Sequence, residues 1–107
     1  MTQVTIKRNQ EGKITRFTVK GHTGYADAGE DIVCAAASSV TWSTANGLEN
    51  VLSIPITYTE KDGYADCIIP DLSPDLREKA DVLLESMNAF FEELTRTHRE
   101  FISKTEV

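Results

Sequence analysis

The sequence has little cysteine: Cys34 and Cys67 are the two in 107 residues, and they lie far apart in the chain. Such a pair gives no disulfide framework, and a reducing compartment keeps both as thiols, so we expect a cytoplasmic protein. No apolar run reaches the roughly 18 residues that a membrane-spanning helix needs. Met1 is followed by polar residues rather than by the apolar core of a signal peptide. We therefore expect no membrane contact.

Positive charge is also scarce. The chain has 11 Lys and Arg against 17 Asp and Glu, which gives a formal net charge of -6. Nonspecific binding to nucleic acid depends on cations that neutralise phosphates, so we expect no direct contact with nucleic acid. A basic protein partner suits this charge better. The composition, with 40% apolar and 26% charged residues, is that of an ordinary globular chain. Residues 1–107 are long enough for one domain with its own core.

Metal and phosphate motifs are absent as well. The candidate soft ligands include no closely spaced pair, whereas zinc sites depend on such pairs. The glycines of GHTGYADAGE lack the order GxxxxGK[ST] of a phosphate loop, and their acidic neighbours would repel a phosphate. The sequence therefore predicts no metal site and no cofactor. The ligands considered are His22, Cys34, Cys67 and His98.

Two hairpins and two helices are predicted from the pattern of apolar residues. Residues 4–8 and 14–19 have an extended pattern on either side of an Asn-Gln-Glu-Gly turn, and residues 54–60 and 64–69 flank a Lys-Asp-Gly turn. Residues 100–105 fit either a short final strand or a frayed tail. The order ββαββα, with an optional last strand, predicts an α+β sandwich: a small mixed or antiparallel sheet with both helices packed against it.

The first predicted helix begins with Asp31 as its N-cap and ends before Pro55. Its first two turns are apolar on every side, so we expect this helix to be buried. Ser73 is expected to cap the second helix, in which one apolar stripe follows a spacing of three or four residues. The stripe consists of Leu76, Ala80, Leu83, Leu84, Met87, Phe90, Phe91 and Leu94.

The segment between the first hairpin and the first helix joins the features that suggest chemistry. The glycine-rich residues 21–30 are predicted to form a loop that lets His22 fold back toward Cys34. If Asp31 caps the helix, Cys34 is the third helical residue, where the helix dipole favours a thiolate. Free amides of that first turn are suited to holding an oxyanion. The arrangement predicts a cysteine–histidine pair for acyl transfer.

Each of these residues also has a purely structural interpretation. A free cysteine in an apolar helix is most often buried and inert. Asp31 either caps the helix or orients His22, and Ser38 either bonds near the thiol or bonds back to a helix carbonyl. Ala35 adds no bulk beside the thiol and leaves room for an extended peptide. Trp42 either lines a groove or packs, Cys67 is expected in the core or on a sheet face, and His98 is expected to complement the second helix dipole.

The stretch GHTGYADAGEDIVCAAASSVTWSTANGLE resembles the signature region of the ribosomal-processing cysteine proteases, the Prp family of Firmicutes and related bacteria. Chain length, the leading hairpin and the long C-terminal helix agree with this family, while residues 54–107 match it only in pattern. The residues that carry the resemblance are Gly21, His22, the tyrosine and glycines of the loop, residues 31–35, Ser38, and residues 46–49.

The resemblance implies that Cys34 is the nucleophile and His22 the general base. It implies a substrate loop that moves on binding, which includes Gly21, Gly24, Tyr25 and Gly29. It also implies a homodimer whose substrate is a ribosomal protein precursor. This precursor carries the N-terminal extension of large-subunit protein twenty-seven, which is removed after an aromatic-rich stretch. Two other functions stay open: a non-catalytic ribosome-associated adaptor of the same fold, and a cysteine hydrolase with another peptide or a small thioester as substrate.

Overall fold

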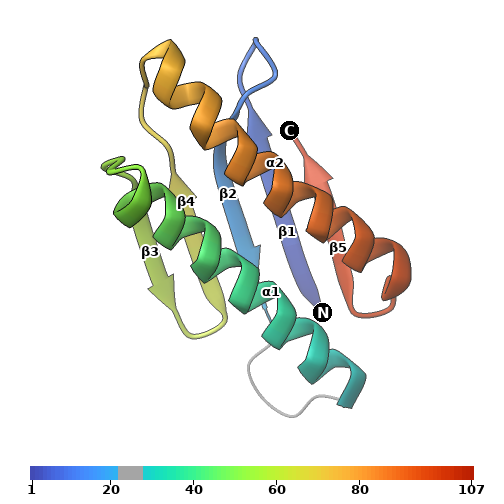
Figure 1. Cartoon of the computed structure of the whole chain (residues 1–107). Helices are drawn as coiled ribbons and strands as arrows, with labels where there is room; N and C mark the ends of the chain where they lie inside the picture. Colours follow the sequence, from blue (N-terminus) through green and yellow to red (C-terminus); the bar gives the residue numbers. More distant parts are fainter. Residues whose placement is uncertain (22–27) are drawn as a thin grey trace.

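Five strands and two long helices follow one another in the order ββαββαβ (Figure 1). The structure, a computed structural model, describes residues 1–21 and 28–107, with side chains from residue 32 onward in the second range. The elements are β1 (Thr2–Arg8), β2 (Ile14–Lys20), α1 (Ala28–Asn46), the π-helical turn η1 (Gly47–Val51), β3 (Thr57–Lys61), β4 (Tyr64–Ile68), α2 (Pro74–Thr97) and β5 (Ile102–Glu106).

The strands form one mixed sheet in the order β3-β4-β2-β1-β5. Neighbouring strands are antiparallel except for β5, which runs parallel to β1 after the chain has crossed the sheet through α2. Both predicted hairpins are confirmed, and their turns contain glycines with positive φ: Gly12 at 79° and Gly63 at 70°. No helix in the described part of the chain is long and apolar enough to cross a membrane.

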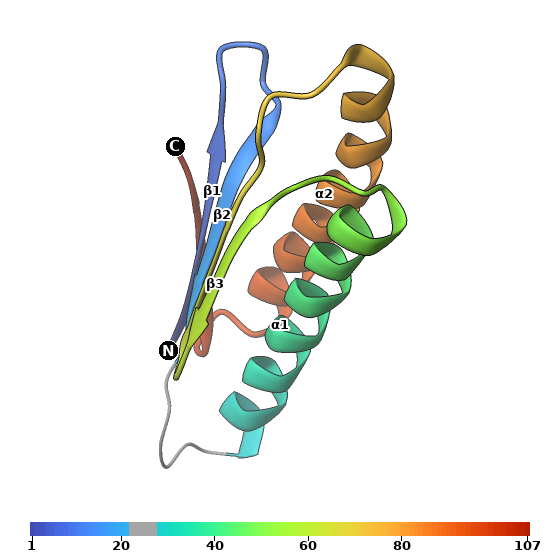
Figure 2. The same cartoon turned by 90° about the vertical axis from the view of Figure 1, so that its left-hand side faces the viewer.

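Both helices cover the same face of the sheet (Figure 2), so the fold has two layers, as the α+β prediction required. Strand residues alternate between the helix layer and the open face: Val4 and Ile6 of β1 are buried, while Gln3 and Lys7 are exposed. The core lies between the layers. Its largest fully buried side chains include Phe17, Phe91, Ile6, Ile14, Leu48, Ile54, Leu84 and Met87.

The second helix largely follows its sequence pattern. Ser73 is the N-cap, and its Oγ accepts a hydrogen bond from the Leu76 amide at 3.4 Å. Most of the predicted stripe is buried, but Phe90 is 40% exposed. His98 is the C-cap residue, and its amide donates to the Leu94 carbonyl at 2.9 Å.

The first helix departs from prediction at its start. It begins at Ala28, so Asp31 lies inside the helix and its assignment as the N-cap is wrong. Gly29 is likewise part of α1 rather than of a loop. A single glycine costs a helix only about 1 kcal/mol, and the good helix formers that surround it offset this penalty. Composition alone therefore placed the boundary one turn too late.

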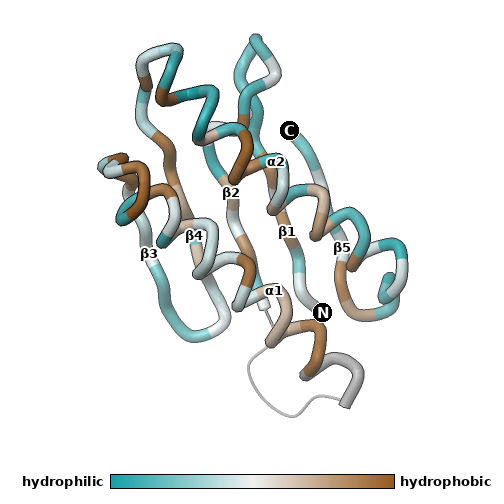
Figure 3. The backbone as a smooth tube through the Cα atoms, viewed as in Figure 1, coloured by the Kyte–Doolittle hydropathy of each residue, from teal (hydrophilic) through white to brown (hydrophobic). Residues whose placement is uncertain are grey.

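The expected burial of α1 on every side is also wrong. Val33, Ala37 and Thr41 form a narrow buried stripe, whereas Ile32 is 66% exposed and Ala35 is exposed. In Figure 3, which colours the chain by hydropathy, hydrophobic residues appear both in this part of α1 and along the strands of the sheet. Because the fold has only two layers, a helix that lies on the sheet and beside α2 keeps one side that no described residue covers.

The last segment forms a strand. Thr2 pairs with Ile102 at the start of the parallel β1–β5 ladder, and the Thr2 amide donates to the Phe101 carbonyl at 2.8 Å. The choice between a strand and a frayed tail is therefore settled in favour of β5. This pairing fixes the first residues of the chain in the sheet.

An ion-pair cluster fastens β5 to its neighbours. The Arg8 guanidinium binds Glu106 through Nε at 2.7 Å and Glu85 of α2 through Nη1 at 2.6 Å. Lys104 Nζ also binds Glu106, at 2.8 Å. Hydrogen bonds from Lys104 and then Arg8 lower the pKa of Glu106 to about 2. The Arg8 guanidinium thus joins β1 to β5 through Glu106 and to α2 through Glu85.

This cluster predicts a pH-dependent contribution to stability. The folded-state pKa of Glu106 is depressed from 4.5 to about 2, so its contribution is fully present above pH 4.5 and is lost as the pH falls through 2. At pH 7 we expect Glu106→Gln to lower the free energy of unfolding by about 0.5 kcal/mol, since the side chain is partly exposed. The deficit should shrink as the pH is lowered. Urea denaturation at several pH values measures both effects.

The control for this experiment is Glu93→Gln. Glu93 pairs with Arg96 three residues later on the exposed side of α2, where solvent screens the interaction. We expect a smaller loss of stability than for Glu106→Gln. An equal loss in the two variants at every pH would mean that the cluster around Arg8 adds nothing.

Candidate active site

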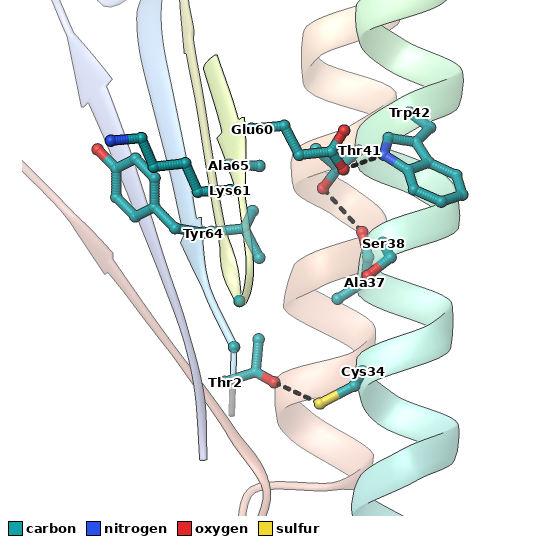
Figure 4. Close-up of a pocket in the computed structure, with 13 residues that line it drawn as sticks. Thr2, Cys34, Ala37, Ser38, Thr41, Trp42, Glu60, Lys61, Tyr64 and Ala65 are labelled. Atoms are coloured by element: carbon teal, nitrogen blue, oxygen red, sulfur yellow. Dashed lines mark hydrogen bonds between the residues drawn. The ribbon is translucent and has the colours of Figure 1, made fainter. Parts of the chain in front are cut away.

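The predicted nucleophile lies where α1 crosses the end of the sheet. Cys34 is in the second turn of α1 and is partly exposed, and its Sγ lies 3.2 Å from Oγ1 of Thr2 in β1 (Figure 4). The sulfur is therefore not enclosed among aliphatic side chains, as a purely structural cysteine would be. It faces the strand end that leads through Gly21 toward His22.

The predicted use of the helix end does not hold. The free amides of an α-helix belong to its first four residues, and in α1 these are residues 28–31. Cys34 lies beyond them, and the effect of a helix dipole fades within the first turn. α1 thus begins too many residues before Cys34 for its free amides to serve both the thiolate and the oxyanion as the sequence had suggested.

A pocket of about 170 Å³ opens beside the sulfur. Small side chains, including Val19, Ala37 and Ala65, line it, so backbone and side chain of an extended peptide have room to approach. Trp42 and Glu60 lie at its far end, while the ring of Tyr64, from β4, points away from the helices (Figure 4). The full lining is Thr2, Val19, Gly21, Cys34, Ala37, Ser38, Thr41, Trp42, Glu60, Lys61, Gly63, Tyr64 and Ala65.

Trp42 lines this pocket rather than packing in the core. Its side chain is 56% exposed, and the indole Nε1 donates a hydrogen bond of 2.6 Å to Oε1 of Glu60 in β3. The bond ties α1 to the edge of the sheet (Figure 4). A second hollow, of about 260 Å³, also borders Trp42 and extends toward Asn46 and Glu49. Concave surface therefore continues along α1 beyond the pocket that holds Cys34.

The structure brings together only part of the predicted site. Ser38, one turn after Cys34, is exposed and lines the pocket. Gly21 also lines it, and its amide donates to the Gly63 carbonyl at 2.7 Å. Ala35 follows Cys34 on α1 but is not part of the pocket lining. The predictions that concern His22, Gly24 and Tyr25, and the side chain of Asp31, lie outside the described residues.

Several residues of the pocket were missed by the sequence analysis, among them Thr2, Glu60 and Tyr64. Thr2 carried a signal, because it shares a strand face with Val4 and Ile6 and is therefore a polar residue at a position expected to be buried. Glu60 and Tyr64 flank the second hairpin turn. Nothing in their spacing indicates that this turn reaches the same pocket as the first strand.

The second cysteine contrasts with the first. Cys67 is fully buried in β4, as predicted, and burial raises the pKa of its thiol to about 12, with smaller contributions from Asp66 and Glu49. It is thus a neutral core side chain. Among residues 1–21 and 28–107, no three His, Cys, Asp or Glu side chains gather closely enough to hold a metal ion.

A partly exposed thiol beside a pocket, on an α+β sandwich of this topology, is an arrangement that suits the nucleophile of a cysteine protease. The model of the family described as "Cysteine protease Prp" matches residues 1–103. The chain therefore belongs to the Prp family of cysteine proteases, whose members act in ribosomal processing.

Relatives and solved structures agree with this assignment. The Bacillus subtilis ribosomal processing cysteine protease Prp is 32% identical, over 98% of this chain and 96% of that protein. The crystal structure of Prp from S. aureus in complex with a substrate peptide matches this chain with a TM-score of 0.89 at 26% identity. The match covers 100% of this chain and 100% of that chain. A second structure of that S. aureus protein, with a covalently linked product peptide, has a TM-score of 0.85 at 28% identity, again over all of both chains.

The contrast between the two thiols predicts selective labelling. Iodoacetamide at pH 7 should add one carbamidomethyl group to the folded protein, at Cys34, because Cys67 is both buried and neutral. In urea two groups should be added. Intact mass and peptide mapping measure the number and the position, and labelling of Cys67 in the folded protein would contradict the structure.

Proposed function

We propose that this protease removes the N-terminal extension of large-subunit ribosomal protein twenty-seven, cutting after an aromatic-rich stretch. The main support is the position of Cys34, whose partly exposed sulfur borders a pocket with room for an extended chain. Relatives named for ribosomal processing, and a neighbour solved with a substrate peptide, support the choice of substrate.

The proposed mechanism is acyl transfer through a thioester. His22 takes the proton from Cys34, and the sulfur attacks the carbonyl carbon of the scissile bond to form a tetrahedral oxyanion. As this intermediate collapses, the C–N bond breaks and the imidazolium returns the proton to the leaving amine. Water, activated by the same imidazole, then hydrolyses the thioester and restores the thiol.

The surroundings of the pocket support a peptide substrate of this kind. Trp42 offers aromatic surface, while Val19 and Ala37 leave space between α1 and the sheet. The net charge of -6 favours encounter with a basic ribosomal protein, because opposite charges raise association rates. The resemblance to this family thus fits both the shape of the pocket and the overall charge.

We also propose that the protein is a homodimer that associates through its helix layer. Val82 and Phe90 lie eight residues apart on α2 and are 68% and 40% exposed. Ile32, on the neighbouring helix α1, is 66% exposed. Exposed apolar side chains on the helix layer of a small protein favour an interface, and a second copy would cover them by a symmetric contact.

The cleavage proposal is tested with a synthetic peptide that carries the aromatic-rich extension and its first mature residues. We expect the wild-type protein to cut one bond in it and Cys34→Ala to cut none, a loss of more than about a thousandfold, because the nucleophile is absent. Mass spectrometry of the products gives the bond, and fluorescence anisotropy shows whether the variant still binds.

Other results separate the alternatives. An intact peptide bound by both proteins, with the Cys34 thiol free, would identify an adaptor. Cleavage of unrelated peptides at equal rates would identify a hydrolase with a different substrate. Ser39→Ala, at an exposed position of α1 outside the pocket, is the matched control and should cut the peptide at the wild-type rate.

The dimer proposal is tested by charge. Val82→Lys should shift the sedimentation coefficient from that of a dimer to that of a monomer, because a buried unpaired ammonium is costly at an interface. Thr105→Lys, at an exposed position of β5, is the matched control and should leave the dimer intact. A wild-type protein that sediments as a monomer at micromolar concentration contradicts the proposal.

A further inference from the structure

We propose that Thr2 is a catalytic residue of this protease: its side-chain hydroxyl donates a hydrogen bond to the Cys34 thiolate and holds the sulfur at the pocket. The inference rests on the proposed function of Cys34 as the nucleophile. It adds a residue from the opposite layer of the fold, which neither the motif around Cys34 nor its spacing from His22 indicates.

The geometry places the two atoms in direct contact. Thr2 Oγ1 lies 3.2 Å from Cys34 Sγ, which is within hydrogen-bond distance for sulfur (Figure 4). Thr2 is 1% exposed, and a hydroxyl on so buried a residue needs a hydrogen-bond partner. The Cys34 sulfur is the partner that the structure provides.

Thr2 is held firmly enough to position another group. Its backbone is paired with Ile102 in β5, and its amide donates to the Phe101 carbonyl at 2.8 Å. The hydroxyl also lies beside the strand end that leads to His22, because a Cβ added to Gly21 would come 3.9 Å from Oγ1. A side chain on a paired central strand is therefore aimed at the reacting atom.

The protonation state of the sulfur decides the direction of the bond. In the thiol form, either the S–H or the O–H can donate. Once the proton has moved to the base, the sulfur can only accept, so the Thr2 hydroxyl must donate to it. Hydrogen bonds to an ionised partner are about twice as strong as those between neutral groups. The contact therefore stabilises the thiolate more than the thiol.

The other charged groups around this pocket come from the second hairpin. Glu60 and Lys61 of β3 and Tyr64 of β4 line it. One carboxylate oxygen of Glu60 already accepts a hydrogen bond from the Trp42 indole. The free amides of α1 belong to residues 28–31 and lie before Cys34 in the helix. Apart from the proposed base His22, Thr2 is thus the group that the described structure places against the sulfur.

The test compares Thr2→Val, which keeps the shape but removes the hydroxyl, with Thr2→Ser, which keeps the hydroxyl. The rate of Cys34 alkylation by iodoacetamide is measured as a function of pH, together with kcat and KM for the extension peptide. For Thr2→Val we expect the alkylation midpoint to rise by about one pH unit and kcat to fall about tenfold, with KM little changed. Thr2→Ser should stay within about threefold of wild type.

Thermal unfolding of each variant shows whether the fold is intact. If Thr2→Val does not fold, Thr2→Ala removes the same hydroxyl and takes its place. An alkylation midpoint equal to that of wild type in the hydroxyl-free variant overturns the inference. So does a Thr2→Ser variant as impaired as Thr2→Val, because the methyl group rather than the hydroxyl would then matter.

The two readouts also keep this inference separate from the proposed function. If the wild-type protein fails to cut the extension peptide while the alkylation midpoints differ as expected, the substrate assignment is wrong and the role of Thr2 toward the thiol is supported. If every variant cuts the peptide at the same rate with the same midpoint, the proposed function holds and the inference about Thr2 is wrong.

Discussion

The position of α1 over the sheet and beside α2 (Figure 2) is the constraint on which the site depends. The buried residues of this helix include Val33, Ala37, Thr41, Thr44 and Ala45, and most of them are small. These residues hold α1 in the helix layer, and Cys34, which follows Val33 in the sequence, is then held at the border between the layers. A larger residue at Ala37 would both fill the pocket and lift the helix away from the strand that carries Thr2.

The last strand matters to the site although it lies far from it in sequence. By pairing with β1, β5 orders the first residues of the chain, and Thr2 is among them. The cluster around Arg8 and Glu106 fastens the other end of the same pair of strands to α2. Parallel pairing needs a crossover connection, and here that connection is α2. The long helix therefore contributes to the site by bringing β5 beside β1 rather than by supplying a side chain.

The elements were predictable where the signal is local, and less so where it is tertiary. Both hairpins, the Ser73 cap and most of the α2 stripe follow from turn chemistry and periodicity. The start of α1 was misplaced because Asp31 fits the local signature of an N-cap, and local preference does not reveal that the helix extends one turn further back. Contacts across layers, such as those of Thr2 with Cys34 and Trp42 with Glu60, join residues that no spacing rule connects.

The two cysteines lie in different environments, and their thiols therefore differ in reactivity. Cys67 is on a central part of the sheet facing the helices, where burial raises the pKa of the thiol to about 12 and leaves a neutral core side chain. Cys34 is at the margin of the same layer interface, where a hydroxyl and an open pocket replace aliphatic neighbours. Since α1 begins too early for its free amides to serve Cys34, the proposed stabilisation of a thiolate is assigned to a side chain of the neighbouring strand, Thr2. The position of the thiol relative to the sheet, more than its position along the helix, therefore accounts for the difference between them.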